Sequence, residues 1–185
     1  MPKLIVIGGS LATGKSTLAK RLEQETGIKR ISMDALKERL FDLGGYRDRA
    51  WSKRIGHVAW DAFQRLVELK LEYGEDVIAE ATFLWPDDAA WIGEVAARQG
   101  ADVYQIWMTA DPAVARNRFI ARAQSGERHP GHNDALEEVI AEFDDRFFCR
   151  TFYPHVLAGK TLVVDTTDLS CVDHDRIRLF LETEL

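Results

Sequence analysis

A glycine-rich segment near the N-terminus has the residue types and the spacing needed to hold phosphate groups. The segment reads Gly9-Ser10-Leu11-Ala12-Thr13-Gly14-Lys15-Ser16 and matches G-x-x-x-x-G-K-[ST] at every fixed position. Its glycines let backbone N–H groups wrap a phosphate, and the start of a following helix attracts the negative charge. Lys15 would add a positive charge, and the Ser16 hydroxyl could bind magnesium. Together with Thr17, the segment predicts a site for a nucleoside triphosphate and Mg²⁺.

The surroundings of this loop favour a small kinase over other nucleotide-binding proteins. The loop directly follows the apolar run 4–7 and directly precedes the helical pattern 17–25. The dinucleotide fingerprint G-x-G-x-x-G is absent. The Asn/Thr-Lys-x-Asp signature expected of a GTPase is also absent, and the run 77–80 ends in Ala-Glu instead of the Asp-Glu of mechanochemical ATPases.

Carboxylates and arginines elsewhere in the chain are further candidates for chemistry. Asp34 follows an expected strand, where it could also be the N-cap of a helix beginning at residue 35. Glu80 ends an apolar run, so its buried charge needs a partner, either magnesium through water or a basic side chain such as Lys15. Four arginines, Arg116, Arg118, Arg122 and Arg128, lie within thirteen residues and could form either a site or a solvated helix surface.

Alternating strands and helices must position these residues. Apolar runs predict strands over 4–7, 28–33, 77–83, 101–109 and 161–165, and helical spacing predicts helices over 17–25, 35–43, 55–73, 86–99, 112–122, 136–147 and 173–185. Strands that are apolar throughout are typical of a parallel sheet covered on both faces. We therefore expect a three-layer α/β fold with a five-stranded parallel sheet, in a single domain spanning residues 1–185.

Composition narrows the functional class. Hydrophobic residues at 46% and charged residues at 29% are typical of a globular protein, and the longest apolar runs are too short for a membrane span or a signal peptide. The net charge of −6 argues against a nucleic-acid partner. Two cysteines, Cys149 and Cys171, lie outside any CxxC pattern, so we expect buried thiols and a cytoplasmic protein.

The chain resembles the compact P-loop kinases, which include nucleoside-monophosphate, shikimate and gluconate kinases. It is most similar to the branch of chloramphenicol phosphotransferase, zeta toxins and polynucleotide kinase. Four segments carry the resemblance: the phosphate loop, Ser32-Met33-Asp34, Glu80-Ala81-Thr82-Phe83, and the arginine-rich stretch 116–128.

The resemblance implies a role for each of these segments. Asp34 would position or deprotonate the acceptor hydroxyl, and Glu80 would support magnesium on Ser16, directly or through water. Segment 116–133 would form a lid whose Arg118, Arg122 or Arg128 closes over the transferring phosphoryl group. Acceptor contacts would come from an insertion at about 36–73 and from about 83–88.

The implied function is ATP- and Mg²⁺-dependent phosphoryl transfer to a hydroxyl of a small-molecule acceptor. The alternatives are a 5′-hydroxyl polynucleotide kinase and a nucleotide-binding switch protein. The basic stretch 47–54 indicates either an anionic acceptor or a solvated helix start. We expect His129 and His132 to serve the lid or the acceptor, because two loop histidines make an incomplete metal site. Trp60 is predicted to pack in the core, and the sequence leaves the oligomeric state open.

Overall fold

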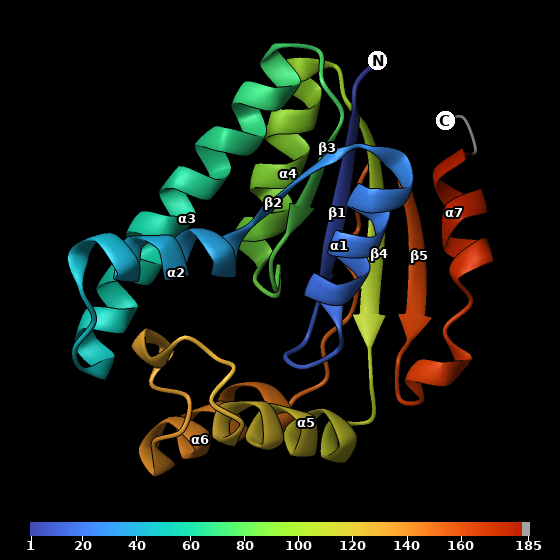
Figure 1. The fold of residues 1–185 in the computed structure, drawn as a ribbon. Coiled ribbons are helices and arrows are strands. Elements are labelled where there is room, and N and C mark those ends of the chain that lie inside the picture. The colour runs from blue at the N-terminus through green and yellow to red at the C-terminus, as the bar shows by residue number, and fades with distance from the viewer. Residues whose placement is uncertain (183–185) are drawn as a thin grey trace.

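Five parallel strands form the centre of the fold in this computed structural model, which describes residues 1–182. They are β1 (Lys3–Gly9), β2 (Lys29–Ser32), β3 (Val77–Glu80), β4 (Asp102–Thr109) and β5 (Lys160–Asp165), in the order β2-β3-β1-β4-β5 (Figure 1). The central strand β1 pairs through Ile5 with Ile78 of β3 and with Tyr104 of β4. The five-stranded parallel sheet predicted from the sequence is confirmed.

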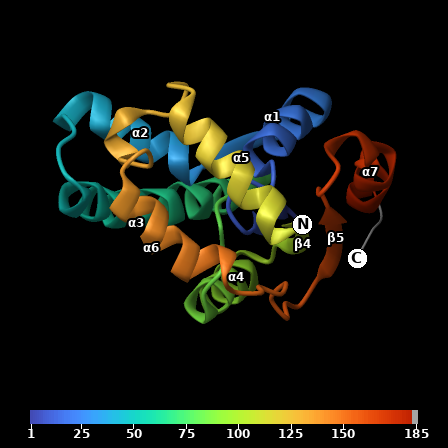
Figure 2. The same ribbon diagram turned by 90° about the horizontal axis from the view of Figure 1, so that it is seen from below.

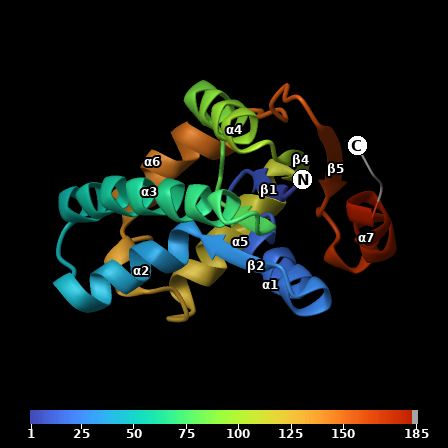
Figure 3. The same cartoon turned by 90° about the horizontal axis from the view of Figure 1, so that it is seen from above.

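Alternate residues of β1 face opposite layers of helices, as the two-residue period of a strand requires. Leu4 and Val6 pack in a core cluster with α3 (Arg49–Glu72) and α4 (Pro86–Gln99). Ile5 and Ile7 pack in a second cluster with α1 (Lys15–Thr26) and α7 (His174–Glu182). The view from above shows the sheet between these two helix pairs (Figure 3). The predicted three-layer arrangement is therefore confirmed.

Two further helices lie across the carboxyl end of the sheet, next to the phosphate loop. These are α5 (Pro112–Gln124) and α6 (Glu137–Phe143), which continues as a π-helical turn over Asp144–Phe148 (Figures 1 and 2). The short helix η1 (Pro130–His132) lies between them in the chain. Helix α2 (Met33–Gly44) packs beside α3 on the flank of the sheet. None of the described helices combines the length and the apolar character that a membrane span requires.

Several predicted boundaries are wrong for local physical reasons. The third strand ends at Glu80 instead of residue 83, because Phe83 has a φ of +47° and the Thr82 carbonyl turns to accept the Gly9 N–H at 2.9 Å. Helix α3 begins at Arg49, well before residue 55, because the Asp48 carboxylate accepts the Trp51 N–H at 2.8 Å and caps the first turn. The helix predicted over 136–147 is divided by the π-helical turn. Residues 183–185 of the predicted closing helix lie outside the described residues.

The expectation of buried thiols is also wrong. Cys149 and Cys171 are both exposed. Each follows or ends a short helical turn at the surface, Asp144–Phe148 in one case and η3 (Leu169–Cys171) in the other. Neither residue belongs to a core cluster.

Substitution of Phe63 in α3 tests how much the packing of the helix layer on the sheet contributes to stability. Its side chain is fully buried against Trp60, Phe83 and Trp91. We expect Phe63→Ala to lower the free energy of unfolding by about 3–5 kcal/mol, because the change removes buried apolar area and leaves a cavity. Denaturant unfolding followed by circular dichroism measures the change. Leu66→Ala, on the exposed side of the same helix, should cost much less, and equal losses would contradict the packing described.

Candidate active site

The phosphate loop joins β1 to α1 through an unusual backbone path. Gly9 has a φ of +124°, and a Cβ there would lie 2.0 Å from the Met108 carbonyl oxygen of β4, so only glycine fits. Gly14, with a φ of +85°, precedes α1 and provides no side-chain cap. The first N–H groups of α1 are therefore left to other acceptors, which makes this helix start suited to an anion.

Lys15 is folded back onto the loop. Its Nζ donates to the Ser10 carbonyl at 2.6 Å, and Thr13 Oγ1 donates to the same oxygen at 2.9 Å. Lys15 is buried, with 8% exposed. Burial lowers its pKa to about 8, although Glu80 and Asp34 oppose the shift. A phosphate arriving here would supply the opposite charge that the buried ammonium lacks.

Ser16 and Glu80 form a second pair at the base of the loop. Ser16 Oγ donates to Glu80 Oε1 at 3.1 Å, and Glu80 is buried, with 4% exposed. Its Oε2 has no hydrogen-bond partner within the described chain, an expensive arrangement for a buried carboxylate. A hydroxyl and a free carboxylate oxygen are ligands that Mg²⁺ accepts. The pair therefore fits Mg²⁺. Residues 1–182 hold no cluster of three or more His, Cys, Asp or Glu able to bind a metal, so phosphate oxygens and water would provide the other ligands of the ion.

Asp34 lies in the first turn of α2 and is not its N-cap. Ser32 takes that position, with Oγ accepting the Ala35 N–H at 3.4 Å. The Asp34 carboxylate instead pairs with Arg128 at 3.0 Å. Burial alone would raise its pKa, but the charges of Arg128, His132 and Lys37 hold the pKa well below its usual range. Asp34 is therefore ionised at neutral pH and free of a capping role.

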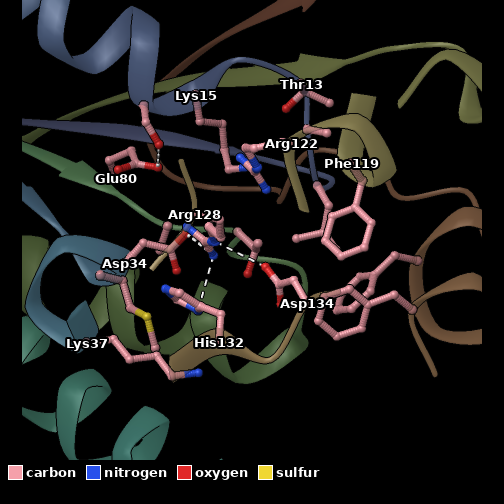
Figure 4. Close-up of a pocket in the computed structure, with 18 of the residues that line it drawn as sticks. Thr13, Lys15, Asp34, Lys37, Glu80, Phe119, Arg122, Arg128, His132 and Asp134 are labelled. Carbon is pink, nitrogen blue, oxygen red and sulfur yellow. Dashed lines mark hydrogen bonds and ion pairs between the residues drawn. The ribbon is translucent and has the colours of Figure 1, made fainter. Parts of the chain in front are cut away.

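Arg128 connects the lid segment, residues 116–133, to α2. Besides Asp34, its guanidinium contacts Asp134 at 3.0 Å (Figure 4). It also contacts Glu38 at 3.3 Å, and His132 Nε2 lies 3.0 Å from Glu38. These carboxylates raise the pKa of the guanidinium even though burial opposes this. Both histidines of this segment contact α2: His132 through Glu38, and His129 through Phe41, on which it stacks with ring centroids 5.3 Å apart.

The lid arginines separate into two groups. Arg122 lines the pocket beside Lys15, and burial and the charge of Arg128 lower its pKa. Within the described chain its guanidinium has no ion pair or hydrogen bond. Arg118 points elsewhere and donates to the carbonyls of Thr166 and Thr167 at 2.7 and 2.9 Å. Arg118 and Arg122 are four residues apart on α5, a spacing that predicts a shared helix face. One turn along α5, however, is enough to carry the guanidinium from the phosphate loop to the loop after β5.

A cavity of about 330 Å³, the central pocket, joins these groups. It is lined by the phosphate loop from Leu11 to Thr17 and by Asp34, Glu80, Arg122 and Arg128. Lys37 and Trp85, which also line it, lie in the expected acceptor segments, and the lining residues outside every expected segment are Asp134, Phe143, Arg146 and Phe147. Lys37 could have been singled out, because it follows Asp34 by one helical turn. The aromatic and arginine side chains of α6 and its π-helical turn gave no such signal.

The basic stretch 47–54 also separates on folding. Arg49 and Lys53 line the central pocket, and both pair with Glu142 of α6 at 3.2 Å. Arg47 and Arg54 lie over the ring of Trp51 instead, 4.9 and 5.6 Å from its centroid. Trp60 packs on Phe63 and Phe83, as predicted, but its ring also lines the pocket.

A protein-family model and several curated proteins match most of this chain in sequence. The family model AAA_33, described as an AAA domain, matches residues 4–148. The uncharacterized protein Rv2004c of Mycobacterium tuberculosis (strain ATCC 25618 / H37Rv) is 31% identical over 146 residues, which cover 75% of this chain and 28% of that protein. The chain thus spans about 28% of the length of the curated relatives it matches.

Solved structures show the same fold over the whole length. A candidate kinase from Chloroflexus aurantiacus j-10-fl has a TM-score of 0.85 at 29% identity, over 100% of this chain and 98% of that one. Kti12 of Chaetomium thermophilum, solved with ADP-AlF3, has a TM-score of 0.66 at 16% identity, over 97% and 95% of the two chains. The second likeness, at this low identity, shows the fold alone.

The buried ammonium of Lys15 should leave a pH signature in the ligand-free protein. Its folded pKa of about 8 is below the ordinary value of 10.5, so between these two pH values the unfolded chain binds a proton that the folded chain does not. The cost of the buried charge is full below about pH 8 and is relieved as the pH rises toward 10.5. We therefore expect Lys15→Met to raise Tm at neutral pH and this advantage to shrink through that window.

Thermal unfolding of both proteins across the pH range measures this difference. Lys20→Met, on the exposed side of α1, controls for the loss of one positive charge. A Lys15→Met protein that is less stable than wild type at neutral pH would contradict the assignment of a desolvated, destabilising ammonium.

Proposed function

The chain belongs to the AAA_33 family, and from this premise we propose that it is a kinase that moves the γ-phosphoryl group of ATP to a hydroxyl of a small-molecule acceptor. One observation carries the proposal: a single pocket has a complete phosphate loop on one side and the ionised carboxylate of Asp34 on the other. The likeness to a candidate kinase over the whole chain supports it.

On the phosphate side of the pocket, Lys15 and Arg122 supply positive charge that a phosphate could neutralise. On ATP binding, the Lys15 ammonium would exchange the Ser10 carbonyl for phosphate oxygens, and Arg122 would gain its first partner. The free N–H groups of the loop and of α1 would hold the same oxygens. Mg²⁺, held by Ser16 with Glu80, would neutralise phosphate charge when bound.

On the acceptor side of the pocket, the main role of Asp34 is to orient the acceptor hydroxyl, and removal of the hydroxyl proton is a lesser role. The low pKa of Asp34, maintained by the Arg128 guanidinium, makes its carboxylate a good hydrogen-bond acceptor and a weak base. Phosphoryl transfer through a loose transition state needs little base catalysis and depends on positioning. We assign Asp34 the role of holding the acceptor hydroxyl in line with the γ-phosphorus.

The proposal is tested by ADP release from ATP and Mg²⁺ in the presence of hydroxyl compounds. A small-molecule acceptor should raise the rate well above the acceptor-free rate, with one phosphorylated product per ADP. Lys15→Met should abolish both rates. ATP binding without acceptor-stimulated turnover would favour a nucleotide-binding switch, and efficient labelling of 5′-hydroxyl oligonucleotides would favour a polynucleotide kinase; either result overturns the proposal.

Asp34→Asn should separate positioning from folding. The amide keeps the shape but loses the charge that accepts the hydroxyl hydrogen bond, so we expect kcat to fall about 100-fold or more with ATP affinity nearly unchanged. Glu38→Gln is the matched control, because it also removes a carboxylate contact of Arg128 but does not line the pocket. Equal losses in the two variants would show that Asp34 acts only by docking the lid.

Glu80→Gln should change the metal requirement. The substitution keeps the side-chain size but removes the charge that would hold a cation beside Ser16, so we expect the Mg²⁺ concentration for half-maximal activity to rise about 10- to 100-fold. Titration of activity with MgCl₂ at fixed ATP measures it. Glu23→Gln, whose carboxylate pairs with Arg30 at 3.2 Å outside the pocket, should leave the titration unchanged. An unshifted curve for Glu80→Gln would remove Glu80 from the metal site.

A further inference from the structure

The central pocket has more positive charge than a triphosphate site alone requires. Cationic side chains that line it are Lys15, Lys37, Arg49, Lys53, Arg122, Arg128 and Arg146, whereas the lining carboxylates are Asp34, Glu80 and Asp134. This excess occurs in a chain whose net charge is −6. Charge of one sign concentrated in a pocket, against the sign of the whole chain, indicates a ligand of the opposite charge.

The cations lie at two ends of the pocket. Lys15 and Arg122 lie on one side of Asp34 and Arg128, next to the phosphate loop, and Lys37 lies on the other side (Figure 4). With Lys37 we group Arg49, Lys53 and Arg146 as the acceptor-side cations. The phosphate groups of ATP account for the cations at the first end. The acceptor-side cations are left for the second substrate.

Three of the acceptor-side cations share one carboxylate. Arg49 and Lys53 lie 3.2 Å from Glu142, and Arg146 lies 2.9 Å from it. Burial opposes the ionisation of Glu142, but these three hydrogen-bonded cations lower its pKa to about 2. One negative charge is thus set against three positive ones, so the cluster has a net positive charge at neutral pH.

Lys37 has no carboxylate within ion-pair distance in the described chain. Its half-buried ammonium lies 5.5 Å from the centroid of the Phe41 ring. Burial lowers its pKa, and the charges of Arg49 and Arg128 lower it further, although Asp34 and Asp134 oppose them. Gly56 of the neighbouring helix α3 lies beside this ammonium, and a Cβ at that position would be in ordinary van der Waals contact with Lys37 Nζ at 3.6 Å.

The spacing of Lys37 and Asp34 limits the size of the ligand. The two residues are one turn apart on α2, so their Cβ atoms are about 5–6 Å apart. A hydroxyl held by Asp34 and an anion held by Lys37 can therefore belong to one small molecule in the same pocket. We propose that the acceptor carries a carboxylate or phosphate group close to its reacting hydroxyl, and that Lys37, with Arg49 and Lys53, binds this group. This inference rests on the proposed kinase function for the identity of the other substrate.

The test measures binding and turnover separately. The binding arm is calorimetry on full-length protein loaded with AMPPNP and Mg²⁺, against two matched series: glycerol, glycerate and glycerol 3-phosphate, and sorbitol, gluconate and sorbitol 6-phosphate. We expect an anionic member to bind at least tenfold more tightly than its neutral polyol, and the preferred anion distinguishes carboxylate from phosphate. The turnover arm measures ADP release with the same compounds.

Substitution of Lys37 identifies the anchor. Lys37→Met should raise the KM for the anionic acceptor at least tenfold with kcat within about threefold, and Lys37→Arg, which keeps the charge, should recover most of the affinity. Arg39→Met, on the exposed side of the same helix, should match wild type. Circular dichroism of each variant confirms folding.

The outcomes of the two arms separate the inference from the proposed function. Turnover of neutral polyols as efficient as that of their anionic partners would leave the kinase standing and overturn the inference. Binding of anions that depends on Lys37, without any turnover, would support the anion site and contradict the kinase. A failure of all six compounds to bind, or anion binding that is unchanged in Lys37→Met, would overturn the inference.

Discussion

The ion pair between Arg128 and Asp34 is the contact that joins the two halves of the site. Asp34 belongs to α2, and Arg128 belongs to a loop more than ninety residues later in the chain, so no local preference brings them together. The guanidinium is held by three carboxylates at once, which compensates for its burial. Because this contact fixes the lid on α2, the shape of the pocket and the ionised state of Asp34 both depend on it.

Steric constraints make this docking specific. A Cβ at Gly131 would lie 2.5 Å from the Phe41 ring, so the lid backbone approaches α2 more closely than any other residue would allow. The His129 ring also stacks on the Phe41 ring, with centroids 5.3 Å apart. The ion pairs of Arg128 therefore hold this segment against α2, and the absence of a side chain at Gly131 allows the close approach. The same logic applies at Gly9, where the missing side chain lets the phosphate loop pass the Met108 carbonyl of β4.

The parts of the site that the sequence predicted are those determined by local pattern. The phosphate loop, Asp34 and Glu80 each lie where a strand ends, and the carboxyl ends of parallel strands share one edge of the sheet. Strands β1, β3 and β4 were predictable because most of their residues are apolar and buried. The partners of Glu142 and the direction of Arg118 were not, because they depend on how α5 and α6 cross the end of the sheet. That crossing is decided by packing between distant aromatic residues, such as Phe119 against Phe143.

Net charge is a poor guide to the chemistry of this pocket. A chain with a net charge of −6 has a pocket in which cations outnumber carboxylates, because its acidic residues lie mostly on exposed surfaces where water screens them. Inside the pocket, burial removes water from the cations and lowers the pKa values of Lys15, Lys37 and Arg122, and the charges of neighbouring arginines lower them further. A bound anion would offset this cost of burial. An anion that arrives at either end changes the charge felt at the other, so the two ends of the pocket are coupled through Asp34 and Arg128 at its middle.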